Sequence, residues 1–131
     1  MRAIIILITL ILFPFNSCEK ETVPLNISFE LKFGVKKIIN DTNIEIKIDS
    51  VSDSRCPIDV VCVWEGNAIV SFILTEGNND IKFKLNTHSN YRRDTLINHY
   101  RIKLTGLNPP NRINPPNKLE DYKAELIITK E

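Results

Sequence analysis

The chain has 131 residues, 43% of them hydrophobic and 25% charged, and its 17 basic side chains nearly balance its 16 acidic ones. This length suits one domain with one modest core. Lysine and arginine form no cluster beyond the pairs Lys36-Lys37 and Arg92-Arg93, so the composition argues against nucleic-acid binding, which requires a basic surface.

Residues 1–18 have the pattern of a bacterial lipoprotein leader. Arg2 precedes an apolar stretch from Ala3 to Phe13, and Pro14 ends any helix before Cys18. The stretch is too short to span a bilayer, which takes about 20 apolar residues. The segment from Phe15 to Cys18 resembles a lipobox, which implies cleavage before Cys18 and acylation of that cysteine by a diacylglyceryl group and an N-acyl chain such as palmitate.

We therefore expect a signal peptide at residues 1–17, a lipidated cysteine and tether at residues 18–25, and a folded domain at residues 26–131. An ordinary secretory peptide with an incidental cysteine is the alternative. Two or more acyl chains hold a protein firmly on a membrane. The membrane is thus the first expected partner, and the bacterial cell envelope is the expected location, with the outer membrane favoured.

Apolar and polar residues alternate with a period of two along most of the remaining chain, as in half-buried antiparallel strands. Residues 68–74 are apolar on both parities, which favours a central strand covered on both faces. Glu76 to Asp80 has the composition of a hairpin turn. No segment has the 3.6-residue period of a helix. The alternating segments are residues 27–33, 44–49, 81–85, 100–104 and 122–128.

Six to seven short strands with turns between them predict an all-β fold, a single antiparallel β-sandwich that is immunoglobulin-like or related. Closure into an open barrel is the alternative. Asn108 to Lys118 repeats an Asn-Pro-Pro-Asn motif and is expected to be extended, either as a stiff crossover between sheets or as a recognition loop. The expected core residues are Phe29, Leu31, Ile46, Ile48, Val70, Phe72, Phe83, Ile102, Leu104, Leu126 and Ile128.

The segment from Asp53 to Ala68 holds two of the three cysteines, the only tryptophan and four charged residues within sixteen positions. Cys56 and Cys62 are expected to form a disulfide, because an envelope compartment permits oxidation and Pro57 restrains the loop between them. Trp64 is expected to cover this bridge or to cap the sandwich, with its indole N–H bonded to a carbonyl.

Two other uses of the cysteines fit the spacing poorly. A thiol redox pair usually has two residues between its cysteines, whereas five separate Cys56 from Cys62. A metal site that combined them with His88 and His99 would exceed the usual ligand spacing. A metal or cofactor is therefore not expected.

The segment 53–68 resembles a functionally unassigned group of small secreted or lipid-anchored bacterial proteins. Their signature is Asp-Ser-Arg-Cys-Pro, a short gap, and Cys-apolar-Trp-x-Gly-x-Ala, which residues 53–68 match with Glu65 at a position where small residues are common. A looser similarity follows at residues 100–109 and 122–126. The resemblance implies a small all-β envelope domain and assigns no catalytic residue.

The candidate binding surface consists of Asp53, Arg55, Asp59, Trp64 and Glu65, held rigid by the disulfide. The alternative is an internal ion pair between Asp53 and Arg55 that orders the loop. The chain has no nucleophile elbow or phosphate-binding glycine loop, so no catalytic residue is assigned. The sequence thus predicts a non-catalytic binding or assembly module with an envelope protein or glycan as partner. An envelope enzyme or enzyme inhibitor acting through loop 53–66 is the alternative.

Overall fold

The computed structural model of the protein describes residues 20–131. The predicted signal peptide at residues 1–17 and the predicted acylation site Cys18 lie outside these residues and stay predictions. In the described part of the chain, no helix is long and apolar enough to cross a membrane.

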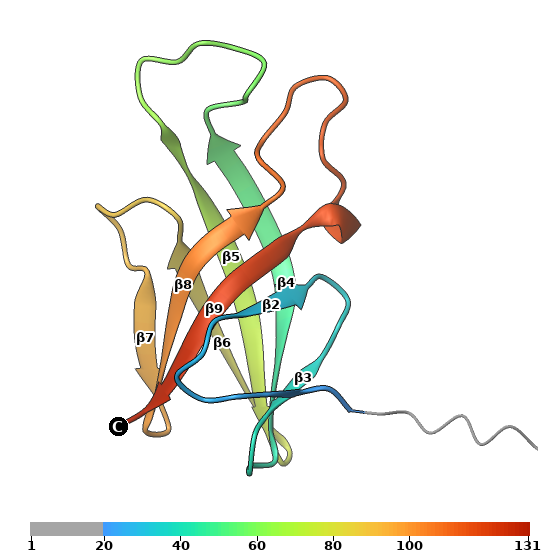
Figure 1. Ribbon diagram of the computed structural model, residues 1–131, viewed down its shortest axis with the longest axis vertical. Helices are drawn as coiled ribbons and strands as arrows, with labels where there is room; N and C mark the ends of the chain where they lie inside the picture. The colour runs from blue at the N-terminus through green and yellow to red at the C-terminus, as the bar shows by residue number, and fades with distance from the viewer. Residues whose placement is uncertain (1–19) are drawn as a thin grey trace, which may run out of the picture.

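Two sheets pack face to face and form a β-sandwich (Figure 1). The first sheet has five strands in the order β1-β3-β4-β5-β6, and the second has four in the order β2-β9-β8-β7. The predicted all-β sandwich is therefore confirmed. The strands are β1 (Thr22–Val23), β2 (Phe29–Lys32), β3 (Lys37–Ile39), β4 (Ile44–Arg55), β5 (Gly66–Glu76), β6 (Asn79–Asn86), β7 (Asp94–Ile97), β8 (Tyr100–Asn108) and β9 (Lys123–Lys130).

The core is built from the apolar parity of both sheets, as the alternation predicts. Phe29 and Phe83, on the edge strands β2 and β6, are only half-buried and pack against the core from its border. The other predicted core residues are buried. Further buried side chains are Val23, Ile39, Ile44, Ala68, Leu74, Leu85, Leu107, Tyr122 and Ala124.

The sandwich has more strands than the six to seven expected. β1, β3 and β7 have only two to four residues each, too few to display an alternating pattern. β2 is shorter than the expected strand 27–33, and Ile27 before it is 60% exposed. The hairpin turn between β5 and β6 is confirmed, with Glu76 opposite Asn79.

The folded domain begins earlier than residue 26. Thr22 and Val23 pair in parallel with Ile38 and Ile39, and Val23 is buried at 1% exposure. The predicted tether at residues 18–25 is therefore wrong over its last part. The reason is that burial of the apolar Val23 side chain in the core is favourable, whereas in a solvated spacer this side chain would remain in water.

The order of the strands differs from that of an immunoglobulin domain, so the fold is a β-sandwich of another topology. Strands β3, β4, β5 and β6 follow one another in a single sheet, and β7, β8 and β9 follow one another in the second. An immunoglobulin domain instead distributes its strands as A, B, E and D on one sheet and C, F and G on the other.

β5 lies between β4 and β6 in its sheet, but its outer face is not covered by a further layer, contrary to expectation. Ile69 on this face is 37% exposed, whereas Ile73 is only 7% exposed. Lys47 and Lys82 are the cross-strand neighbours of Ile73. The aliphatic stems of such lysines can cover an apolar neighbour while their charges stay in water, which explains why both parities of β5 are apolar.

The proline-rich segment does not link the two sheets. It joins β8 to β9, which are adjacent antiparallel strands of the same sheet. It is also not extended throughout, because the chain turns at residues 113–116. The predicted crossover between the two sheets and the predicted extended, polyproline-like conformation are thus both wrong. The segment is the connection of a long hairpin.

Candidate functional site

Two long loops meet at one end of the sandwich (Figure 1). Loop 56–65 joins β4 to β5, and loop 109–118 joins β8 to β9. We call these two loops together the tip. They are bonded to each other, because Ile58 N–H donates to the Asn111 carbonyl at 3.0 Å and Asn111 Nδ2 donates to the Arg55 carbonyl at 2.7 Å.

Cys56 and Cys62 form the predicted disulfide, with their Cα atoms 5.9 Å apart. The bridge closes loop 56–65 on itself near the base of the tip. Both sulfur atoms are used in the bridge, so neither is available as a metal ligand. Among residues 20–131, no group of three or more histidine, cysteine or acidic side chains is placed to hold a metal ion.

Gly66 allows the chain to enter β5 directly beneath the disulfide. Its φ is +73°, and a Cβ atom at this position would lie 2.2 Å from the Ser54 carbonyl oxygen and 2.8 Å from Arg55 Cα. Both the left-handed conformation and the close approach of the backbone require glycine. Ala68, two residues later, is fully buried and donates its N–H to Thr87 Oγ1 at 2.9 Å.

Asp53 and Arg55 form an internal ion pair and not an open surface. Arg55 Nε and Nη2 donate to the two carboxylate oxygens of Asp53 at 2.8 and 2.7 Å. The guanidinium also donates to the carbonyls of Leu107 and Pro109, each at 2.7 Å. The Arg55 and Asp53 side chains are only 17% and 5% exposed. Arg55 therefore connects β4 of one sheet to the end of β8 in the other sheet through hydrogen bonds.

The electrostatics of Asp53 follow from this network. Burial raises the pKa of the carboxyl group, but the hydrogen bonds and charge of Arg55, together with the hydroxyl of Tyr122, lower it, and the net pKa of Asp53 is below its ordinary value of 3.8. Tyr122 donates its O–H to Asp53 at 2.9 Å. Burial raises the pKa of Tyr122. Asp53 is thus held as a carboxylate.

Asp59 also orders the tip from within. Its two carboxylate oxygens accept the backbone N–H groups of Ile113 at 3.1 Å and Asn114 at 3.2 Å. The bond from Ile113 is the main reason that the pKa of Asp59 lies below its ordinary value. Asp53, Arg55 and Asp59 were predicted from sequence as part of a binding surface. Asp53 and Arg55 instead form the internal ion pair that was the alternative, and the Asp59 carboxylate bonds to loop 109–118.

Trp64 and Glu65 lie on the surface at the side of the tip. Trp64 is 54% exposed, so it does not cap the sandwich as expected, and its ring lies against His88 with centroids 5.7 Å apart. The carboxylate of Glu65 lies 2.8 Å from Nε2 of His88. These two members of the predicted surface are therefore accessible.

The most exposed apolar side chains of the tip were missed by the sequence analysis. Val61 and Val63 are fully exposed, at 101% and 103%, and Ile58 and Ile113 are each 57% exposed. Several exposed apolar side chains gathered at one end of a domain mark an interaction site more often than single exposed residues do. The available signal was the run of three valines around Cys62, which fits neither a strand nor a turn.

No protein-family model matches the chain, and no curated protein and no solved structure matches it. The class that the fold and site define is a small β-sandwich with a disulfide-braced, apolar tip.

Proposed function

We propose that this protein is a lipid-anchored, non-catalytic binding module of the bacterial envelope, and that it binds a partner protein through the tip. The observation that carries the proposal is the exposure of Val61 and Val63 on a loop that a disulfide, Arg55 and Asp59 hold in one conformation. A rigid loop loses little conformational freedom on binding, so more of the contact energy remains as affinity.

The position of the tip relative to the expected anchor supports a partner away from the anchoring membrane. Lys20 lies 3.8 Å from Glu45 at the beginning of β4, whereas the tip leaves from Arg55 at its end. Ten residues of strand separate these points, which is about 33 Å at 3.3 Å per residue. Only a few residues join Cys18 to the fold, so an anchor at Cys18 would hold the opposite end of the sandwich at the lipid.

The character of the tip favours a protein as partner. Its exposed large apolar side chains are Ile58, Val60, Val61, Val63, Trp64 and Ile113. The buried centre of a protein–protein interface is apolar and its rim is polar. The carboxylate of Asp59 at this end already accepts hydrogen bonds from two backbone N–H groups, so it does not need a donor from the partner. Burial of the valines would supply the affinity.

Photo-crosslinking in the native envelope tests this function. A benzophenone amino acid replaces Val63 in the full-length protein, and the matched control places it at Ile27, which is 60% exposed near the end of β9. We expect one defined protein crosslinked from position 63 and none from position 27. The Val61→Ser/Val63→Ser protein should lose binding to that purified partner by at least about tenfold. Equal products from both positions would overturn the proposal.

An enzyme inhibitor is the second candidate. A protruding, covalently braced loop with an exposed apolar side chain can enter a cleft of an enzyme without changing shape. The crosslinked partner distinguishes the two. If it is a hydrolase whose activity falls when the wild-type protein is added, but not when Val61→Ser/Val63→Ser is added, the tip acts as an inhibitor.

A further inference from the structure

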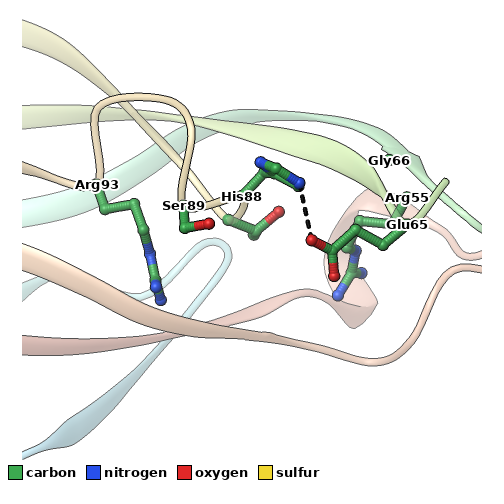
Figure 2. Close-up of a pocket in the computed structure, with 7 residues that line it drawn as sticks. Arg55, Glu65, Gly66, His88, Ser89 and Arg93 are labelled. Atoms are coloured by element: carbon green, nitrogen blue, oxygen red, sulfur yellow. Dashed lines mark ion pairs between the residues drawn. The ribbon is translucent and has the colours of Figure 1, made fainter.

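A hollow beside the tip contains charged groups that the proposed function does not use (Figure 2). Its volume is about 320 Å³, which is at the lower end of the range for small-molecule sites. The side chains that matter for its chemistry are Glu65, His88, Ser89 and Arg93. Arg55 also lines it, but its guanidinium is paired with Asp53. Glu65 belongs to loop 56–65 of the tip, whereas the exposed Val61 and Val63 do not line the hollow.

Arg93 brings a positive charge to this hollow without a carboxylate partner among residues 20–131. Its Nη2 makes only long bonds to the carbonyls of Leu104 and Thr105, at 3.3 and 3.4 Å. Its Nε is buried and has no acceptor in the described structure. A guanidinium has five N–H donors, so Arg93 has donors and charge left for an anionic ligand.

Glu65 supplies a negative charge on the other side of the hollow. Nδ1 of His88 accepts the N–H of Asn90 at 3.1 Å, and Nε2 lies 2.8 Å from Glu65. His88 therefore holds the Glu65 carboxylate in place through Nε2 while its other ring nitrogen is bonded to the backbone.

The hollow thus has a positive charge on one side and a negative charge on the other. Figure 2 shows Arg93 and Glu65 on opposite sides, with the hydroxyl of Ser89 between them. A ligand that fits must offer a carboxylate to Arg93 and O–H donors to Glu65. A phosphate dianion has no donor for Glu65 and would be repelled by it.

Two aromatic rings lie next to His88, which lines the hollow. The ring centroids of Trp64 and Tyr91 are 5.7 and 5.8 Å from that of the imidazole. They are 54% and 51% exposed. Aromatic faces of this kind pack against the C–H face of a sugar ring, while the polar groups bond to its hydroxyls.

We propose that this hollow binds an acidic saccharide. Its carboxylate bonds to Arg93, its ring hydroxyls bond to Ser89 and Glu65, and its apolar ring face packs on Trp64 or Tyr91. The hollow adjoins the tip and shares loop 56–65 with it, but Val61 and Val63, which carry the proposed protein contact, do not line the hollow.

Isothermal titration calorimetry of the purified full-length protein tests the site. The probes are digalacturonic acid and a glucuronic acid disaccharide, each compared with its methyl ester, which keeps the ring and removes the charge. We expect at least one acid to bind about tenfold or more tightly than its ester. Succinate controls for a carboxylate without a sugar. Equal binding of acid and ester, equal binding of succinate, or no binding of either acid would overturn the proposal.

Matched variants locate the binding. Arg93→Gln should weaken the acid by at least about tenfold, whereas Arg92→Gln, at the exposed neighbouring arginine, should leave it within about twofold. Circular dichroism checks that each variant is folded. Should Arg93→Gln fail to fold, Ser89→Ala and Glu65→Gln alter exposed groups and should each weaken binding. Val61→Ser/Val63→Ser should bind the acid normally. An effect of Arg92→Gln equal to that of Arg93→Gln would overturn the assignment.

Discussion

Two arginine–carboxylate clusters, at opposite ends of the sandwich, use the same chemistry in different surroundings. Arg55 with Asp53 is largely buried and also bonds to two backbone carbonyls of the neighbouring sheet. Arg101 pairs with Asp94 and Glu131, and all three side chains are 40% to 46% exposed. The hydrogen bond from Arg101 is the main reason that the pKa of Glu131 is lowered.

The comparison teaches that surroundings, rather than the type of ion pair, decide what the pair contributes. Exposed pairs are screened by water and salt and contribute little. A pair removed from water is costly to break, because the remaining charge is left buried without its partner. We therefore expect the Arg55 cluster to hold the fold at the tip and the Arg101 cluster to be nearly neutral for stability.

The largest expected effect is that of Arg55→Ala, which should reduce the free energy of unfolding by about 3 to 5 kcal/mol. The change leaves the Asp53 carboxylate unpaired and removes the bonds to Leu107 and Pro109. Urea denaturation followed by circular dichroism measures it. A loss below about 1 kcal/mol would mean that the buried cluster behaves as a surface pair, and the comparison would fail.

Gly66→Ala should cost at least about 2 kcal/mol, because a left-handed alanine costs about 1 to 2 kcal/mol and the Cβ would also overlap the backbone of Ser54. Gly77→Ala is the matched control. Gly77 also has a positive φ, of +61°, but nothing lies within 4 Å of its Cβ position. Denaturation of both variants therefore separates the conformational cost from the close approach beneath the Arg55 cluster. Equal losses would show that the backbone at Gly66 can move away.

Low pH should reduce the free energy of unfolding, because protonation of Asp53 removes its ion pair with Arg55. Because the folded-state pKa of Asp53 is lowered, its stabilising effect is present above the ordinary value of 3.8 and is lost as the pH falls through the folded-state pKa. The difference in unfolding free energy between the wild-type protein and Asp53→Asn should therefore be largest near neutral pH and shrink below about pH 4. Denaturation across this range measures it. A difference that is the same at every pH would contradict the charged pair.

The smallest expected effect is that of Arg101→Ala, which should leave the melting temperature close to that of the wild-type protein. Salt should reduce this effect further, because the cluster is exposed and screened. Melting temperatures at low and high salt give both results. A loss comparable with that of Arg55→Ala would show that the exposed cluster holds β7, β8 and the C-terminal residue together more firmly than its surroundings suggest.

The sequence by itself predicted the all-β sandwich, most of the core and the disulfide between Cys56 and Cys62. The physical reason is that alternation along a strand and the spacing of two nearby cysteines are local properties. The short strands β1, β3 and β7 were not predicted, because two to four residues are too few to show an alternation of apolar and polar residues. Val23 was assigned to the tether for the same reason.

Only the tertiary structure decided the roles of the charged residues in the candidate site. Asp53, Arg55 and Asp59 are ordinary charged residues in the sequence, and their partners Leu107, Pro109 and Ile113 lie more than 50 positions away. Whether a charge faces water or a distant carbonyl depends on how two loops from different hairpins pack together. The same packing brings Glu65 and Arg93 to one hollow, which no local pattern predicts. It also leaves Val61 and Val63 in water, for which the run of valines around Cys62 was the only local signal.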